Sequence, residues 1–390
     1  MNKNRKVKTM GSGSKNNATY DSSLVVASVS LTSNATTTKL TNHALLATLL
    51  LLLLAACGTE QGGAPEQGAG AEETTFVQGY TPPEEPPPPP EPAEAPPLEE
   101  EPAGRVVEVG EGPEGMVADP ETNLVAVGLR DPDVLALLDG ESGERVREVD
   151  LPESPRHLQL AAPGGPVLVP AERSDSLAQV TLPDGDVSDE TPVGAFPHDA
   201  TAAPNGRIFV ANEFGDTVSV VEDGEEIRTL EAPQQPGNVT ATRDGLVGVI
   251  GVRGLALEVY DAETLESFGR IDAGEGPTHV VAGPDGRFYV ADTRGGEILV
   301  YEARPEPGRV ASAPLPEGYP YGLAMDAERE QLWVTLTAEN SLVRFDISGA
   351  TPREMDRYPT VRQPNTVAVN PETGRVYVAG RDGGIQIIDS

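Results

Sequence analysis

Three histidines stand one or two residues after a proline, and they are the residues of this chain whose chemistry is most distinctive. They are His157, His198 and His279. Imidazole nitrogens bind Zn, Cu, Ni and Fe ions, and they exchange protons near neutral pH. The simpler interpretation is structural, because a histidine between a proline and a strand can hydrogen-bond a loop carbonyl. The strands and turns around these histidines determine whether the side chains can reach a common site.

The segments that hold the histidines belong to a repeat of about 41 residues. A proline followed by a short apolar strand recurs seven times, at spacings of 39 to 44 residues. Each unit continues with a tight turn such as "PNGR" or "PDGR", a strand such as "IFVAN" or "FYVAD", and a further strand such as "TVSVVED". Asn-Gly and Asp-Gly favour hairpin turns, and regular short strands favour a propeller. The anchor prolines are Pro113, Pro155, Pro197, Pro236, Pro277, Pro320 and Pro364.

The repeat predicts an all-β fold over residues 104–390, namely a seven-bladed β-propeller of four-stranded antiparallel blades. The segment "RVVEVG" at the start reads as a fourth strand without a preceding blade, and "GIQIID" at the end as a third strand without a fourth. We therefore expect these N-terminal and C-terminal strands to pair in the last blade, which leaves no open sheet edge.

The units "IFVANEFGDTVSVVED", "FYVADTRGGEILVYE" and "VYVAGRDGGIQIID" resemble the YVTN (YncE-like) β-propeller repeat. The resemblance covers residues 104–390 and implies a seven-bladed ring that is often extracytoplasmic. It implies no single activity, because related propellers include surface-binding proteins, lactonase-like and lyase-like enzymes, and quinoprotein or haem-associated domains. Function must therefore be argued from the site.

In a propeller, the connection into the first strand of each blade lies at one mouth of the central channel, together with the loop after the second strand. We therefore expect a channel-mouth site, where imidazoles and a carboxylate could hold a divalent metal or a polar ligand. No other cofactor is implied by a motif. The candidate residues are His157, His198, Asp199, Glu213, Asn238, His279, Asp292 and Asn365, and the candidate metal ligands are His157, His198 and His279.

Residues 1–56 are predicted to be a bacterial lipoprotein signal peptide. The run "ALLATLLLLLLAAC" is too short to cross a bilayer comfortably and resembles a signal core that ends in a lipobox. Cys57 is the chain's only cysteine, and we expect it to carry the acyl (palmitate) anchor. The stretch before the run is long for a signal peptide, so a translation start downstream of Met1 would suit it better.

Residues 57–103 form a Gly/Pro/Glu-rich segment that we expect to be a disordered, extended linker, because it has too little apolar surface to fold. The net charge of −34 argues against nucleic-acid partners. The sequence therefore predicts a monomeric, membrane-anchored, extracytoplasmic lipoprotein. Its propeller is expected to bind a small ligand, a metal or an envelope protein at the mouth. Two alternatives stay open: a lactonase-like or lyase-like enzyme that uses the mouth histidines, and an envelope scaffold.

Overall fold

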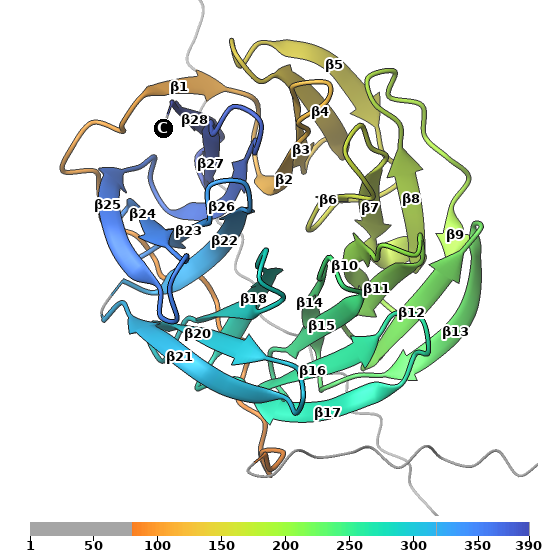
Figure 1. Ribbon diagram of the computed structural model, residues 1–390. Coiled ribbons are helices and arrows are strands. Elements are labelled where there is room, and N and C mark those ends of the chain that lie inside the picture. The colour runs from red at the N-terminus through yellow and green to blue at the C-terminus, as the bar shows by residue number, and fades with distance from the viewer. Residues whose placement is uncertain (1–79, 317, 390) are drawn as a thin grey trace, which may run out of the picture. The chain divides into compact units, whose positions relative to one another are not determined.

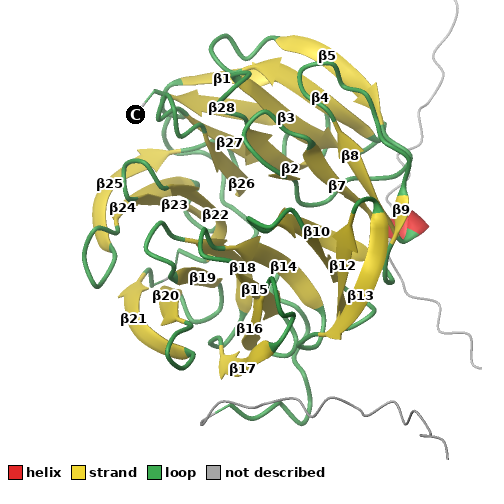
Figure 2. Cartoon of the chain, turned by 45° about the vertical axis from the view of Figure 1, so that its right-hand side comes forward, coloured by secondary structure: helices red, strands yellow, loops and turns green. Residues whose placement is uncertain are grey.

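A computed structural model describes residues 80–316 and 318–389 of the protein. Within these residues, seven four-stranded antiparallel sheets are arranged as blades around a central channel (Figure 1). Figure 2 shows that strands and their loops make up almost all of the ring, with one short helical turn, η1 (Glu172–Ser174). The predicted all-β, seven-bladed propeller is thus confirmed.

The first four blades follow the chain, each with its strands in sequence order from the channel outwards. Their strands are β2 (Pro113–Ala118), β3 (Leu124–Leu129), β4 (Val134–Asp139), β5 (Arg145–Asp150); β6 (Gln159–Leu160), β7 (Val167–Ala171), β8 (Ser176–Val180), β9 (Thr191–Pro192); β10 (Pro197–Ala202), β11 (Ile208–Asn212), β12 (Thr217–Glu222), β13 (Glu225–Glu231); and β14 (Pro236–Ala241), β15 (Leu246–Gly251), β16 (Ala256–Asp261), β17 (Ser267–Asp272).

The last three blades repeat the pattern, except that the seventh takes its outer strand from the start of the ring. Their strands are β18 (Pro277–Ala282), β19 (Phe288–Asp292), β20 (Glu297–Glu302), β21 (Gly308–Pro314); β22 (Pro320–Asp326), β23 (Gln331–Leu336), β24 (Ser341–Asp346), β25 (Arg353–Pro359); and β26 (Pro364–Val369), β27 (Val376–Gly380), β28 (Gly384–Ile388), β1 (Arg105–Glu108).

Burial explains the composition of each strand. The second strands, such as β11 and β19, are buried at every position because they pack against neighbouring blades on both faces. The fourth strands, such as β5 and β13, are exposed at nearly every position and carry the charged residues. Apolar clusters lie between adjacent blades, and burial of each large side chain contributes about 1.5–3 kcal/mol.

The ring closes through the pairing of β1 with β28, as the end strands of the sequence predict. Arg105 pairs with Ile387 and Glu108 with Gly384 in antiparallel register. The buried side chain of Gln386 reinforces this closure, since its amide contacts three backbone groups. Its Oε1 accepts from the amide of Val361 (3.0 Å), and its Nε2 donates to the carbonyls of Ala103 (2.8 Å) and Pro359 (2.9 Å).

The structure differs from the expected regular propeller with an extended linker in two features. The second blade has inner and outer strands of only two residues each, and prolines without N–H groups stand before β7 and within it. Residues 80–103, expected to extend away from the domain, make hydrogen bonds with the propeller instead. Residues 1–79, which include the predicted signal peptide and Cys57, lie outside the described part of the chain. Among the described residues, no helix has the length and apolar character needed to cross a membrane.

Candidate functional site

The anchor prolines place side chains at the channel mouth through a recurring backbone irregularity. In six blades the register between the first two strands shifts directly after the anchor proline, as between Pro197 and Asp199 or between Pro277 and His279. A bulge of this kind leaves an extra residue unpaired and turns its side chain away from the regular alternation. The first two residues after each proline therefore both face the channel.

The first residue after each anchor proline lines a cavity of about 310 Å³ at the mouth. The second residue lines a separate cavity of about 310 Å³ within the channel. His157 and His279 border both cavities and so lie at the boundary between them. The mouth ring consists of Glu114, Arg156, His198, Gly237, Thr278, Tyr321 and Asn365. The channel ring consists of Gly115, His157, Asp199, Asn238, His279, Gly322 and Thr366.

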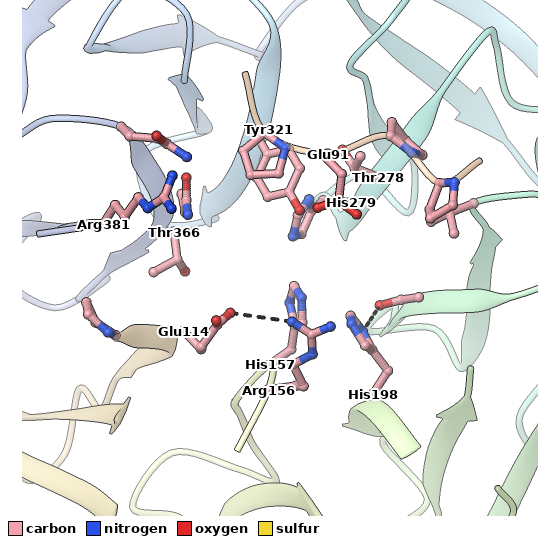
Figure 3. A pocket seen from close by; sticks show the side chains of 18 of the residues that line it. Glu91, Glu114, Arg156, His157, His198, Thr278, His279, Tyr321, Thr366 and Arg381 are labelled. Atoms are coloured by element: carbon pink, nitrogen blue, oxygen red, sulfur yellow. Dashed lines mark hydrogen bonds and ion pairs between the residues drawn. The ribbon is translucent and has the colours of Figure 1, made fainter. Parts of the chain in front are cut away.

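The three predicted histidines come together, although they belong to the second, third and fifth blades. The ring of His157 lies 4.8 Å from that of His198 and 4.9 Å from that of His279, measured between centroids. His279 also makes an edge-on contact with Tyr321 at 4.7 Å. Figure 3 shows these side chains around the same space. His157 therefore contacts both other histidines, one from the neighbouring third blade and one from the fifth blade.

All three imidazoles are neutral at physiological pH. Burial, followed by the positive charge of Arg156, lowers the pKa of His198 from 6.5 to about 3. Burial alone lowers the pKa of His279 to about 4. Burial and the neighbouring His198 hold the pKa of His157 well below its usual range. Neutral imidazole is the form that binds a metal ion.

One ring nitrogen of His198 is fixed by the backbone, which leaves the other available to a ligand. Nδ1 lies 2.6 Å from the carbonyl oxygen of Gly237 (Figure 3), so the neutral ring donates its proton there. Its Nε2 then presents a lone pair toward Glu213, whose Oε2 is 4.0 Å away. Fixing one nitrogen on a carbonyl is how proteins orient metal-binding histidines.

Only one of the two carboxylate oxygens of Glu213 accepts a hydrogen bond from the described residues. Its Oε1 accepts a hydrogen bond of 2.7 Å from the amide of Gln235. Its Oε2 is buried and accepts no hydrogen bond from the described residues. Burial raises the pKa of Glu213, and the negative charges of Glu172 and Glu91 raise it further. A buried carboxylate oxygen without a partner lowers the stability of the fold, because its lost hydration is not replaced by a hydrogen bond. Such an atom is available to bind a metal ion.

Glu172, which the candidate set omitted, completes a group with these two residues. One ligand atom each from Glu172, His198 and Glu213 lies within 4.8 Å of the others. Glu172 also pairs with Arg156 and, at 3.6 Å, with Arg130. A positional signal for it exists in the sequence, because Glu172 directly follows the second strand of its blade, and the residue at that position lines the mouth cavity in three other blades. Those three residues are Glu213, Val252 and Arg381.

Asp199 joins three blades beneath the mouth rather than the metal-ligand group. Its carboxylate accepts hydrogen bonds from the Gln159 side chain (3.0 and 3.1 Å), the Asn238 side chain (2.5 Å), and the backbone amides of Val239 (3.0 Å) and Ala200 (2.9 Å). Burial raises the pKa of Asp199 to about 7, against the lowering effect of these donors. Asn238 is part of the same network and also accepts from the amide of Val280 at 2.6 Å.

The two remaining candidates are placed differently from each other. Asn365 lines the mouth cavity, and its buried Oδ1 accepts no hydrogen bond within the described chain. Asp292 lies behind the loop that follows β19, where it accepts from the backbone amides of Glu275 (2.9 Å), Gly276 (2.8 Å) and Gly295 (3.0 Å). Both oxygens of Asp292 thus accept hydrogen bonds from loop amides, and Asp292 borders neither cavity.

These features define a seven-bladed β-propeller with a polar, histidine-rich mouth. No protein-family model matches the sequence, and no curated protein matches it. Solved structures do match the fold. A chain of hydrazine synthase from Kuenenia stuttgartiensis is 18% identical with a TM-score of 0.63, covering 73% of this chain and 97% of that one.

Virginiamycin B lyase from Staphylococcus aureus is also similar, at 18% identity and a TM-score of 0.59, covering 72% of this chain and 97% of the lyase. A chain of a mitotic checkpoint complex is 13% identical with a TM-score of 0.63, covering 76% and 97%. These similarities establish the fold, and they include enzymes as well as a component of a protein assembly. The resemblance to the YVTN repeat in particular stays a prediction.

Proposed function

We propose that this propeller binds a divalent metal ion at its channel mouth, through Glu172, His198 and Glu213. The observation that carries the proposal is the convergence of their three ligand atoms within 4.8 Å. Two of these atoms have no stronger partner, namely the lone pair on His198 Nε2 and the buried Oε2 of Glu213. A metal ion bound between these two atoms would give each of them the partner that it lacks in the protein.

The donor set indicates the class of ion. One imidazole and two carboxylates suit Zn, Mn, Fe, Co or Ni, and the mature chain has no thiolate beyond Cys57 to favour softer ions. At metal–ligand distances of 2.0–2.2 Å, tetrahedral ligands lie about 3.4 Å apart, so the group must contract by about an ångström on binding. The strongly acidic chain raises the local concentration of cations.

Calorimetric titration of the full chain with Zn²⁺, Mn²⁺ and Ni²⁺ tests this function. We expect one ion per chain, with affinity lost in Glu213→Gln and retained in Glu328→Gln. Glu328 is a suitable control because its side chain is 65% exposed and pairs with Arg243 on the surface. Equal affinity in the two variants would refute the assignment of Glu213 as a ligand.

A lyase-like or hydrolase activity is the second candidate function, and lyases are among the structural neighbours. A virginiamycin B lyase was also solved with quinupristin as a catalytically inactive variant in which one histidine is replaced by alanine. Here the low pKa values of His198 and His279 make them weak proton acceptors at neutral pH. An enzyme at this mouth would therefore depend on bound metal.

Incubation of the metal-loaded chain with quinupristin separates the two functions. Turnover that is lost in His198→Asn would support the enzyme. Binding without turnover would support the binding module. If neither occurs and the ion still binds, metal binding itself is the activity of the mouth.

We further propose that the protein is held at the outer face of the cell membrane by an acyl group on Cys57. The support is the leucine-rich run and the lipobox-like "LAAC" at residues 54–57. Metabolic labelling with a palmitate analogue should mark the wild-type chain and leave Cys57→Ser unlabelled. Equal labelling of both would refute acylation at this position.

A further inference from the structure

An acidic, proline-rich segment lies along one side of the mouth cavity and is held there by loops of the ring. We call residues 86–96 the mouth segment, whose sequence is "PPPPPEPAEAP". Its chain is orange in Figure 1, and part of it passes beside the cavity in Figure 3. It belongs to the stretch that composition predicts to be an extended linker, so its docking on the ring needs a physical cause.

Arginines of two neighbouring blades hold the first half of the mouth segment by its carbonyl oxygens. Arg253 donates through Nε to Pro87 (3.0 Å) and through Nη2 to Pro86 (3.2 Å). Arg294, at the equivalent loop position of the next blade, donates to Pro88. Prolines offer carbonyl acceptors without competing N–H donors, and an extended proline run leaves those carbonyls exposed. The guanidinium groups are therefore matched to this kind of segment.

The second half of the mouth segment is held from the sixth and seventh blades, which directly follow the two blades that hold the first half. Its contacts are Ala93 N to Thr337 Oγ1 (3.0 Å), Arg362 Nη2 to Ala95 O (3.3 Å) and Asn340 Nδ2 to Pro96 O (2.9 Å). The attachment sites thus lie on four consecutive blades, the fourth to the seventh, and the segment runs along the rim of the mouth on that side of the ring.

The middle of the mouth segment forms one wall of the cavity. Pro89, Pro90, Glu91 and Pro92 line it together with the histidines, and Pro90 is buried. Figure 3 shows Glu91 in the same region of the cavity as His279 and Tyr321. The charge of Glu91 also contributes to raising the pKa of Tyr321, after the larger effect of burial. The segment therefore occupies space that an organic ligand of the mouth would need.

We propose that the mouth segment is an intramolecular cover, which must detach from the ring before a ligand larger than an ion reaches the three histidines. The inference goes beyond metal binding and does not depend on it, because it concerns access to the cavity. The attachments are hydrogen bonds to partly exposed carbonyls, so the cover is displaceable and the covered and open forms exchange. A ligand that binds only the open form would shift this exchange toward opening.

Chemical modification of the histidines tests the cover without any metal or ligand. Diethyl pyrocarbonate acylates neutral imidazole nitrogens, and peptide mass spectrometry separates His157, His198 and His279 from His43, the only other histidine. The full chain is compared with Arg253→Ala/Arg294→Ala, which removes the contacts with Pro86, Pro87 and Pro88. We expect modification of the mouth histidines to be at least about tenfold faster in the variant, since the loss of even one of the three hydrogen bonds from charged donors corresponds to about that factor.

A matched control is Arg243→Ala/Arg353→Ala, which removes two arginines that are 69% and 73% exposed and pair with Glu328 and Asp346. It should leave the modification rate unchanged, and equal urea midpoints of all three proteins would show that the ring is intact. A second variant, Pro88→Ala/Pro89→Ala/Pro92→Ala, keeps every carbonyl but increases the freedom of the detached segment, and it should also accelerate modification.

Equal modification rates in the wild-type chain and both cover variants would overturn the proposal. Faster modification in the control as well as in the cover variants would also overturn it, because the effect would then come from lost surface charge. A failure of metal binding would leave these rates unaffected, so the two proposals fail separately.

Discussion

Replacing His198 with asparagine should make folding less sensitive to acid. In the native protein the pKa of His198 is about 3, whereas the unfolded residue has a pKa of about 6.5. The unfolded chain therefore binds a proton below pH 6.5 that the native chain does not bind. Stability from this group is complete above pH 6.5 and is lost as the pH falls toward 3. Asparagine keeps an N–H donor for the carbonyl of Gly237 but takes up no proton.

The size of the effect follows from the pKa difference. A pH of 5 is about 1.5 units below the pKa of the unfolded histidine. Protonation of the unfolded chain therefore lowers the free energy of unfolding by about 2 kcal/mol at this pH. Solvent screening reduces this value little, because the side chain is only 12% exposed. The difference in stability between wild type and His198→Asn should therefore change by about 2 kcal/mol between pH 7.5 and pH 5, in favour of the variant.

Urea unfolding at the two pH values, with a chelator present, measures this change. Taking the difference between the two proteins cancels other titrating groups, including Asp199, whose raised pKa acts in the opposite direction as the pH falls. His198→Gln is a useful second variant. It cannot titrate either, but its longer side chain does not place an amide N–H at the position of Nδ1, so the hydrogen bond to the carbonyl of Gly237 is lost. It should show the same pH effect with a lower stability at both pH values. A difference between wild type and His198→Asn that is constant with pH would refute the low pKa.

Two further substitutions test the ring and the placement of a candidate residue. Gln386→Ala should lower the free energy of unfolding by about 2–4 kcal/mol in urea titrations, because it removes the side-chain partner of the Val361 amide and of the Ala103 carbonyl, whereas the Pro359 carbonyl keeps its bond from the Ala103 amide. A loss below about 0.5 kcal/mol would contradict that role. Asp292→Ala should cost about 1–3 kcal/mol by removing the acceptor of three loop amides, yet leave the affinity for Zn²⁺ unchanged by calorimetry. Loss of Zn²⁺ affinity at unchanged stability would show that Asp292 belongs to the binding site.

The repeat carries most of the information about the fold. Seven anchor prolines at nearly constant spacing define seven blades, and the unpaired strand signals at the two ends define the closure. The same spacing also predicts which side chains reach the channel mouth, because the bulge after each proline repeats from blade to blade. The proline spacing predicts His198 in this way, and the loop after the second strand predicts Glu213. The convergence of His157 with His279 follows from the ring's geometry, which spacing alone does not provide.

Other parts of the site depend on tertiary contacts that composition does not reveal. Glu172 follows a proline-interrupted strand, which hides its equivalence to Glu213 in the sequence, although both directly follow the second strand of their blades. The mouth segment has too little apolar surface to form a core, and composition therefore predicts disorder. Its order comes instead from arginine and amide donors on the ring, which satisfy its carbonyls one by one.

Anomalous X-ray scattering from crystals of the full chain soaked in Zn²⁺ tests the proposed metal site most directly. The account predicts one strong anomalous peak at the mouth, bonded to Nε2 of His198 and to carboxylate oxygens of Glu213 and Glu172, at 2.0–2.2 Å. Peaks only on exposed surface carboxylates, or no peak at the mouth at a saturating Zn²⁺ concentration, would contradict it.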